Sequence, residues 1–182
     1  MNDFELKEVQ VSSEIVYEGR LLHVFKDHVR LPNDKITTRE YIKHVGAVCV
    51  IAIDKDNNVI IENQFRYPFD CVITELPAGK LDSAEEAPLD AAKRELREET
   101  GFTADTWTYL GVYYPSVAYT DEKIHMFMAQ DLVKGAQELD SDEFLSVHKC
   151  PFSELLNAVM ENKIPDGKTQ TAILKAARVL GL

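Results

Sequence analysis

The chain has 182 residues and is acidic, with 31 Asp and Glu against 20 Lys and Arg and a formal net charge of −11. This length suits one domain, or one domain with a small appendage, and a hydrophobic content of 45% is ample for a core. The charge argues against a nucleic-acid-binding or anionic-membrane-binding surface, although it permits a phosphate ligand when a cation mediates.

The N-terminal segment and the cysteines indicate where the protein works. The first residues, MNDFELKEVQ, are acidic and contain no apolar run of the kind found in signal peptides. No stretch of the sequence approaches the length of a membrane span. The three cysteines show no paired spacing, which is typical of free thiols in a reducing compartment. We therefore expect a cytoplasmic protein.

The first 44 residues are predicted to form a small β unit. Residues 1–12 read as a loosely held arm, and residues 13–43 read as strands on either side of the turn at 32–34. This pattern predicts an antiparallel hairpin. Because so small a hairpin is not stable alone, it must pack on the main domain, on a partner subunit, or on both.

Residues 45–182 are predicted to form the main domain. The run AVCVIAI at 47–53 is continuously apolar, which indicates a strand covered on both faces. Further strands are expected at 59–65, 72–78, 107–114, 123–129 and 144–148, with helices beginning near Pro88, Pro151 and Thr169. Strands alternating with only a few helices predict an α/β (α+β) fold, in which a mixed sheet lies between helices.

The helix after Pro88 is strongly amphipathic. Proline suits its first turn, and Gly101 suits the left-handed position that ends a helix. Between these two, Leu89, Ala92 and Leu96 repeat at helical spacing and are expected to face the core.

The same helix carries a cluster of acids. Glu95 and Glu99 are four residues apart, so they lie on one face, with Glu98 beside them. Crowded carboxylates repel one another, and a divalent cation removes that conflict. Ligands that are all oxygen select a hard ion such as Mg²⁺ or Mn²⁺. The alternative is a solvated acidic face, which is what most glutamate-rich helices present.

The motif around this helix resembles the Nudix box. Its members are Gly79, Glu86, Arg94-Glu95-Leu96, Glu98-Glu99 and Gly101-Phe102. The usual spacing is exceeded by one residue, which we place in the turn 82–85, so that Glu86 is the matching glutamate. Because a loop absorbs one residue more easily than a helix does, the acidic face is expected to stay in register.

The likeness covers nearly the whole chain from about residue 15. The segments similar to the ADP-ribose and nucleoside diphosphate sugar pyrophosphatases of the Nudix family are Gln64–Pro68, Glu75–Asp82, Tyr114–Ser116, Asp121–His125 and Asp142–Phe144. The resemblance implies a Nudix fold at 45–182 and a dimerisation domain at 1–44, hence a homodimer. It also implies Mg²⁺-dependent hydrolysis of the diphosphate in ADP-ribose or another nucleoside diphosphate sugar, giving a nucleoside monophosphate and a sugar phosphate. Mn²⁺ is a possible substitute for Mg²⁺.

By resemblance, the metal ligands are the carbonyl of Ala78 and the side chains of Glu95, Glu98 and Glu99. Glu98 would bind a second or third ion and is therefore counted with the catalytic residues. Arg94 is expected to pair with the carboxylates of the box, and Glu86 to support its loop.

The general base is expected in the loop 138–143, since this subfamily takes it from a mobile loop after the box. Glu143 is the first choice, and Asp142 and Asp140 are in reserve. The alternative is that these acids only solubilise the loop.

Substrate contacts are expected from residues outside the box. Arg66 stands where the subfamily places a phosphate-binding arginine, and its planar guanidinium suits a diphosphate, although a surface salt bridge is the alternative. The resemblance also places Glu75, Leu81 and Ser116 at the substrate, and Arg39 could reach the substrate of a partner subunit.

The chain departs from the ADP-ribose hydrolases at one further place. Those enzymes usually have Ser-Pro-Gly where this chain has Ser116-Val117-Ala118, which leaves room for other nucleoside diphosphate sugars. Three alternatives stay open: a Nudix hydrolase of dinucleoside polyphosphates, a Nudix domain that senses nucleotides without cutting them, and an acidic interaction module with no specific Mg²⁺ binding.

Overall fold

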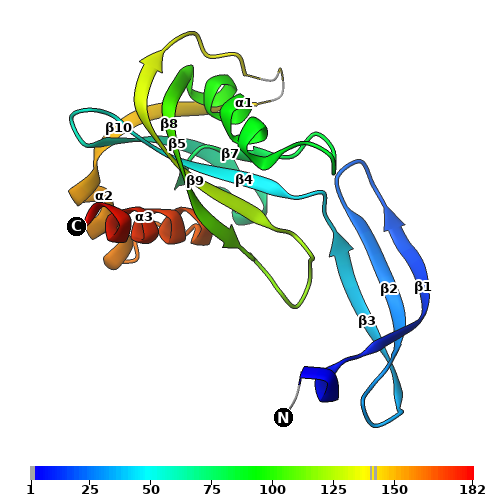
Figure 1. The fold of residues 1–182 in the computed structure, drawn as a ribbon. Coiled ribbons are helices and arrows are strands. Elements are labelled where there is room, and N and C mark those ends of the chain that lie inside the picture. The colour runs from blue at the N-terminus through cyan, green and yellow to red at the C-terminus, as the bar shows by residue number, and fades with distance from the viewer. Residues whose placement is uncertain (1–2, 140, 142) are drawn as a thin grey trace. The chain divides into compact units, whose positions relative to one another are not determined.

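A computed structural model describes residues 3–139, 141 and 143–182. The chain divides into two compact units (Figure 1). The first contains the residues up to His44 together with Tyr114–Glu122, and the second contains Val45–Tyr113 and Lys123–Leu182. Among the described helices, none is long and apolar enough to cross a membrane.

The first unit is built on a three-stranded antiparallel sheet. After a short 3-10 helix at Asp3–Leu6, the strands are β1 (Val9–Glu18), β2 (His23–Arg30) and β3 (Ile36–Lys43), in the spatial order β1-β2-β3. The expected hairpin therefore has a third strand, and β1 begins inside the stretch that was expected to be a loose arm. Every residue of β1 is exposed, so burial imposes no alternating pattern on its sequence.

A polar centre holds this sheet together. The buried carboxylate of Asp27 accepts hydrogen bonds from Gln10 (2.7 Å) and from the Tyr41 hydroxyl (3.1 Å). The ring of Tyr41 stacks on Phe25, with 5.8 Å between centroids. The segment Tyr114–Glu122 joins the same unit because its Tyr119 carbonyl accepts the Ile42 N–H at 2.8 Å.

The second unit contains a mixed seven-stranded sheet in the order β10-β5-β4-β9-β8, with β6 paired to β5 and β7 paired to β4. Its strands are β4 (Ala47–Ile53), β5 (Asn58–Arg66), β6 (Cys71–Glu75), β7 (Ala78–Lys80), β8 (Phe102–Tyr113), β9 (Ile124–Lys134) and β10 (Leu145–Pro151). The pairing of β4 with β9 is parallel, and the other pairings are antiparallel. All seven residues of β4 are buried, as its apolar run predicted.

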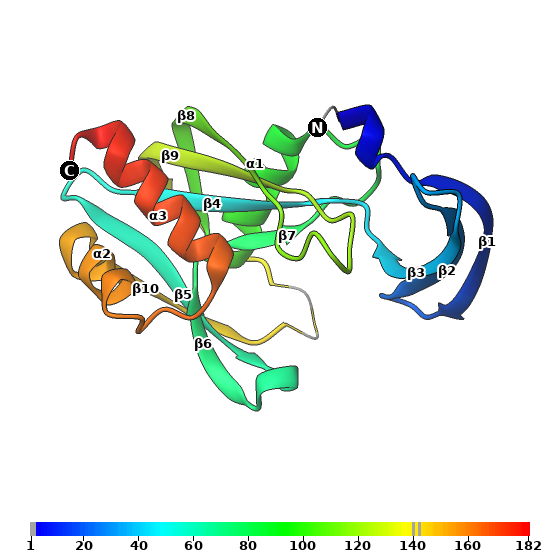
Figure 2. The ribbon, with the colours of Figure 1, turned by 90° about the horizontal axis from the view of Figure 1, so that it is seen from below.

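Helices cover both faces of this sheet, which confirms the predicted layer order. Helix α1 (Pro88–Thr100) lies on one face, and α2 (Phe152–Met160) and α3 (Gly167–Leu180) lie on the other (Figures 1 and 2). Two apolar clusters result: Leu96 packs with Val48 and Ile60 on the α1 side, and Ile173 packs with Ile51 on the α3 side.

Helix α1 starts and ends where the sequence indicates. Pro88 occupies its first turn, and Gly101 adopts φ 72°, with its N–H donating to the Arg97 carbonyl at 2.8 Å. Ala92 and Leu96 are fully buried under the helix. This packing fixes the face of α1 that points to β7, where the acidic cluster lies.

Candidate active site

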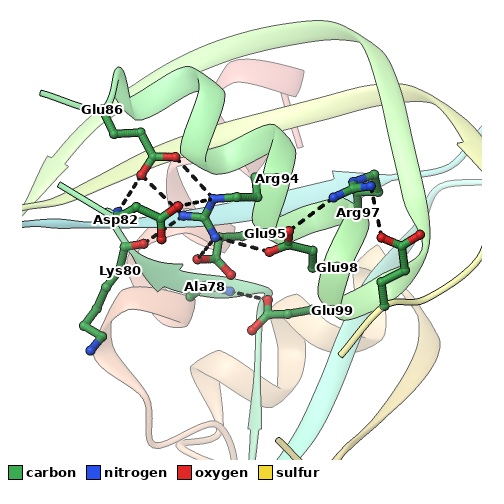
Figure 3. A network of polar contacts seen from close by, with 10 residues as sticks. Ala78, Lys80, Asp82, Glu86, Arg94, Glu95, Arg97, Glu98 and Glu99 are labelled. Carbon is green, nitrogen blue, oxygen red and sulfur yellow. Dashed lines mark hydrogen bonds and ion pairs between the residues drawn. The ribbon is translucent and has the colours of Figure 1, made fainter. Parts of the chain in front are cut away.

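The acids of α1 meet the backbone of β7 (Figure 3). Glu99 is only 3% exposed, and its Oε2 accepts the Ala78 N–H at 2.9 Å. The carboxylate of Glu95 lies so close over Gly79 that a Cβ at this position would overlap it. Any side chain at position 79 would therefore displace the Glu95 carboxylate.

Arg94 ties the helix to the preceding loop. Its guanidinium donates to Glu95 (2.8 Å) and Glu98 (3.2 Å), and also to Glu86 (3.2 Å) and to the Lys80 carbonyl (3.0 Å). This is the pairing expected for Arg94, and Figure 3 shows the side chain at the centre of the network. The arginine is thus occupied with the protein's own carboxylates.

Glu86 closes the loop before α1. It accepts the Asp82 N–H at 2.7 Å, and its hydrogen bond from Arg94 is the main reason why its pKa is lowered. The expected insertion in the turn 82–85 stays a prediction, and Glu95, Glu98 and Glu99 lie together on α1.

The electrostatics of the cluster suit a cation. Burial raises the pKa of Glu99 to about 10, and the nearby charges of Glu62 and Glu95 add to that shift. Burial likewise raises the pKa of Glu95. Two crowded carboxylates beside a backbone carbonyl form an oxygen donor set that fits a hard divalent ion. Within the described residues, no three Asp, Glu, His or Cys side chains converge as metal ligands must, so the Ala78 carbonyl matters to this set.

A second polar network lies next to the box and joins Arg66 to Glu75. The two side chains form a two-point ion pair, Nε–Oε1 at 2.6 Å and Nη2–Oε2 at 2.8 Å. Lys168, at the start of α3, also binds Glu75 and contacts Asp166 at 3.0 Å. The salt bridge that was the alternative to phosphate binding by Arg66 is thus present. It is bidentate and half-buried.

A cavity of about 510 Å³ opens beside this network. Arg66, Glu75 and Lys168 provide its charged wall, while Phe69 and Ile73 contribute apolar surface. Sequence reasoning missed Lys168, because nothing in the local pattern of α3 distinguishes it from a surface lysine.

Sequence reasoning also missed Glu62. This residue of β5 is 1% exposed, and burial raises its pKa to about 8, with the charge of Glu75 adding to the shift. The available signal was a glutamate directly after the apolar run 59–61 of β5.

The remaining candidates for substrate binding are Leu81, Arg39 and Ser116. Leu81 is buried in the core under α1, and its N–H donates to the Gly46 carbonyl. Arg39 and Ser116 belong to the first unit. There, Arg39 pairs with Glu8 at 3.0 Å, and the carbonyl of Ser116 accepts two backbone N–H groups in a turn.

Of the candidate bases, Glu143 is described and half-buried, whereas Asp140 and Asp142 lie outside the described residues. The negative charge of Glu143 contributes to the raised pKa values of Glu95 and Glu99, so Glu143 lies within electrostatic reach of the cluster. The pairing of Leu145 with Gln64 brings this end of β10 to the end of β5.

Comparison with known proteins identifies the family. The family model described as NUDIX domain matches residues 43–170. The chain belongs to the Nudix family. A second model, the nucleoside diphosphate sugar hydrolase N-terminal domain, matches residues 8–42 of this Nudix protein. Nudix hydrolases need a divalent cation, in keeping with the acids on α1.

Two curated relatives match over almost the full chain. The ADP-ribose pyrophosphatase of Bacillus subtilis (strain 168) is 39% identical over 170 residues, which are 92% of this chain and 91% of the relative. The methanol dehydrogenase activator of Bacillus methanolicus is 37% identical over 169 residues, with the same two coverages of 92% and 91%. Among solved structures, an ADP compounds hydrolase shares the fold, with a TM-score of 0.84 and 22% identity over 96% of this chain and 95% of that one.

Proposed function

We propose that this Nudix hydrolase cleaves the diphosphate bond of ADP-ribose or a related nucleoside diphosphate sugar, giving a nucleoside monophosphate and a sugar phosphate. The observation that carries the proposal is the convergence of Glu95 and Glu99 on the backbone at Ala78 and Gly79. The 39% identity to an ADP-ribose pyrophosphatase supports ADP-ribose as the first substrate to test.

The cation is proposed to be Mg²⁺, with Mn²⁺ as a substitute. The Ala78 carbonyl, Glu95, Glu98 and Glu99 would hold it. When bound, such an ion offsets the charge of the diphosphate and lowers the pKa of water. Arg94 keeps Glu95 and Glu98 oriented, because it donates a hydrogen bond to each of them.

Glu143 is proposed as the general base. The carboxylate of Glu143 accepts a proton from the attacking water, and the oxygen of that water forms a new bond to one phosphorus. The bridging oxygen leaves on the other phosphorus, so that water is added across the anhydride. The proximity of Glu143 to Glu95 and Glu99 supports this role, whereas Asp140 and Asp142 keep it only as sequence-based candidates.

Arg66 is proposed to bind a phosphate of the substrate. Glu75 accepts hydrogen bonds from two nitrogens on one edge of the guanidinium, Nε and Nη2, which fixes its plane and leaves the remaining donors for a ligand. The cavity that Arg66 lines offers about 510 Å³, within the range of small-molecule sites.

The protein is further proposed to be a cytoplasmic homodimer that associates through its first unit. Support comes from the family model at residues 8–42 and from β1, whose apolar side chains are exposed. Val11 and Ile15 are 52% and 53% exposed, respectively. A second copy would cover such side chains, and Arg39 would then be available to a partner's substrate.

Phosphate release in the presence of a coupled phosphatase tests the function. The panel is ADP-ribose, ADP-glucose, UDP-glucose, GDP-mannose and a dinucleoside polyphosphate, each with Mg²⁺, with EDTA, and with Glu99→Gln in place of the native chain. We expect turnover of a nucleoside diphosphate sugar that needs both the metal and Glu99. Binding of the panel without turnover would instead favour a nucleotide-sensing domain, and preferred cleavage of the dinucleoside polyphosphate would favour that class of Nudix hydrolase.

A further inference from the structure

Glu62 is a buried acid for which neither the Nudix box nor the substrate contacts have a role. It lies in the middle of β5 and is 1% exposed. Its Oε2 is buried and finds no hydrogen-bond partner in the described part of the chain. A buried carboxylate oxygen without a partner is costly, so its presence calls for a compensating group.

The sheet directs Glu62 toward the helix that carries the box acids. Ile60, two residues earlier on β5, packs in the apolar cluster under α1 together with Leu96. Because side chains alternate along a strand, Glu62 lies on the same face as Ile60. Its partner in β10, Val147, also packs against that cluster.

Strand pairing places Glu62 opposite Glu75. Strand β4 pairs with β5 at Ala52 and Ile60, but with β7 at Cys49 and Ala78. Continuing the first register by two residues brings Glu62 level with Val50, whose N–H instead donates to the Pro77 carbonyl at 2.8 Å. Glu62 therefore lies where β5 parts from β4 and pairs with β6 instead. There it stands opposite Glu75, three residues before the Ala78 whose N–H holds Glu99.

The charges around Glu62 point the same way. Apart from burial, the charge of Glu62 is the largest cause of the raised pKa of Glu99. The cations that act on Glu62 are Lys168 and Arg66, and both bind Glu75. Glu62 and Glu99 are both buried, and the two cations that act on Glu62 are already bound to Glu75.

We propose that Glu62 is a further carboxylate of the divalent-cation site, which it joins from β5 beside Glu99. This extends the site from α1 and β7 to β5 and gives the unpartnered oxygen its compensating charge. The inference rests on the proposed cation site. It assigns Glu62 to cation binding, and it holds whichever nucleotide is the substrate.

Binding of Mn²⁺ to the full chain, without substrate, tests this role. Calorimetry and electron paramagnetic resonance measure the binding. We expect Glu62→Gln to weaken Mn²⁺ binding by about 10- to 100-fold. The metal-free Tm should be equal to or higher than that of the native chain, because Gln is neutral and the folded chain no longer has to hold a proton on a buried acid. The matched control is Glu154→Gln, an exposed acid in the first turn of α2, which should change neither value.

Equal Mn²⁺ affinities for the native chain and Glu62→Gln would overturn the proposal. A second variant, Glu62→Leu, tests whether the amide group of Gln itself affects binding. It should fold, and its Tm should rise less on adding Mn²⁺ than the Tm of the native chain does. A full rise would also overturn the proposal. Absence of Mn²⁺ binding to the native chain would overturn the cation site and this inference together, whereas intact Mn²⁺ binding without any hydrolysis would count against the proposed function alone.

Discussion

At the scale of single residues, Gly79 shows how closely the loop and helix of the site approach each other. A side chain of even one carbon would meet the carboxylate of Glu95. We expect Gly79→Ala to lower kcat/KM by about 100-fold, because a displacement of a catalytic group by about 1 Å has effects of that size. Steady-state hydrolysis of the preferred substrate measures it. Lys80→Ala, which trims the exposed neighbouring side chain, is the control and should stay near the native value.

Glu143 is the residue on which the proposed chemistry depends most directly. Replacing it with Gln removes the proton acceptor while keeping the shape, so turnover should fall by about 10²–10⁴-fold with the fold intact. The matched control is Glu138→Gln, an exposed acid of the same loop that pairs with Arg97 at 3.1 Å. Near-native turnover of Glu143→Gln would move the role of base to another acid.

The raised pKa values of Glu62 and Glu99 make stability depend on pH. Both acids have an ordinary pKa of 4.5, raised by burial to about 8 for Glu62 and about 10 for Glu99. Above pH 4.5 the unfolded chain releases these protons while the folded chain retains them, so the free energy of unfolding should fall as the pH rises from about 5 to about 8. Urea unfolding in EDTA at several pH values measures this slope.

Added Mg²⁺ should reduce the same slope, because a cation bound to the carboxylates replaces the protons. Glu62→Gln should also flatten it in EDTA, since one of the two raised groups is gone. If the free energy of unfolding without metal stays constant or increases over this pH range, Glu62 and Glu99 are not buried acids with raised pKa values.

At the scale of elements, α1 joins the core to the site. Leu96 is fully buried, one residue after Glu95. Leu96→Ala should therefore destabilise the protein by about 2–5 kcal/mol, the usual cost of a cavity in a packed core. Urea unfolding at constant pH measures it, and Lys93→Ala, on the exposed side of the same helix, should cost less than about 0.5 kcal/mol. Similar values for the two variants would show that α1 is held by something other than its apolar face.

The elements that the sequence predicted well are those with a strong local signal. The apolar run of β4 predicted its burial, and Pro88 and Gly101 predicted the ends of α1. The third strand of the first unit was missed because β1 is exposed throughout. The start of β8 at Phe102 was also missed, since the strand follows the helix without a connecting turn.

The same limit applies to the site. The box acids share one helix, so their spacing alone predicts that they lie together. Strand pairing places Glu62 opposite Glu75, and the packing of α3 brings Lys168 to the same Glu75; these long-range contacts leave no periodic trace in the sequence. The pairing of Arg66 with Glu75 joins two strands whose register the sequence does not specify.

At the scale of the whole molecule, the exposed apolar residues of β1 lead to a prediction about assembly. Light scattering should give twice the chain mass of 20.6 kDa. Val11→Asp combined with Ile15→Asp should shift the protein toward the monomer, because both side chains are about half exposed in a single chain. A native protein that is monomeric at micromolar concentration would rule out the dimer.

The path of the chain has a consequence for how such a protein can change over evolutionary time. The segment Tyr114–Glu122 is encoded within the Nudix portion but folds with the N-terminal sheet, to which Tyr119 is bonded through Ile42. Exchanging the first 44 residues for those of a relative would separate β3 from the segment that accompanies it. Ser116-Val117-Ala118, where this chain departs from the ADP-ribose hydrolases, lies in that same segment. Substrate preference and subunit association are therefore expected to be inherited as one trait, and a recombinant that mixes two parents at residue 44 should lose both.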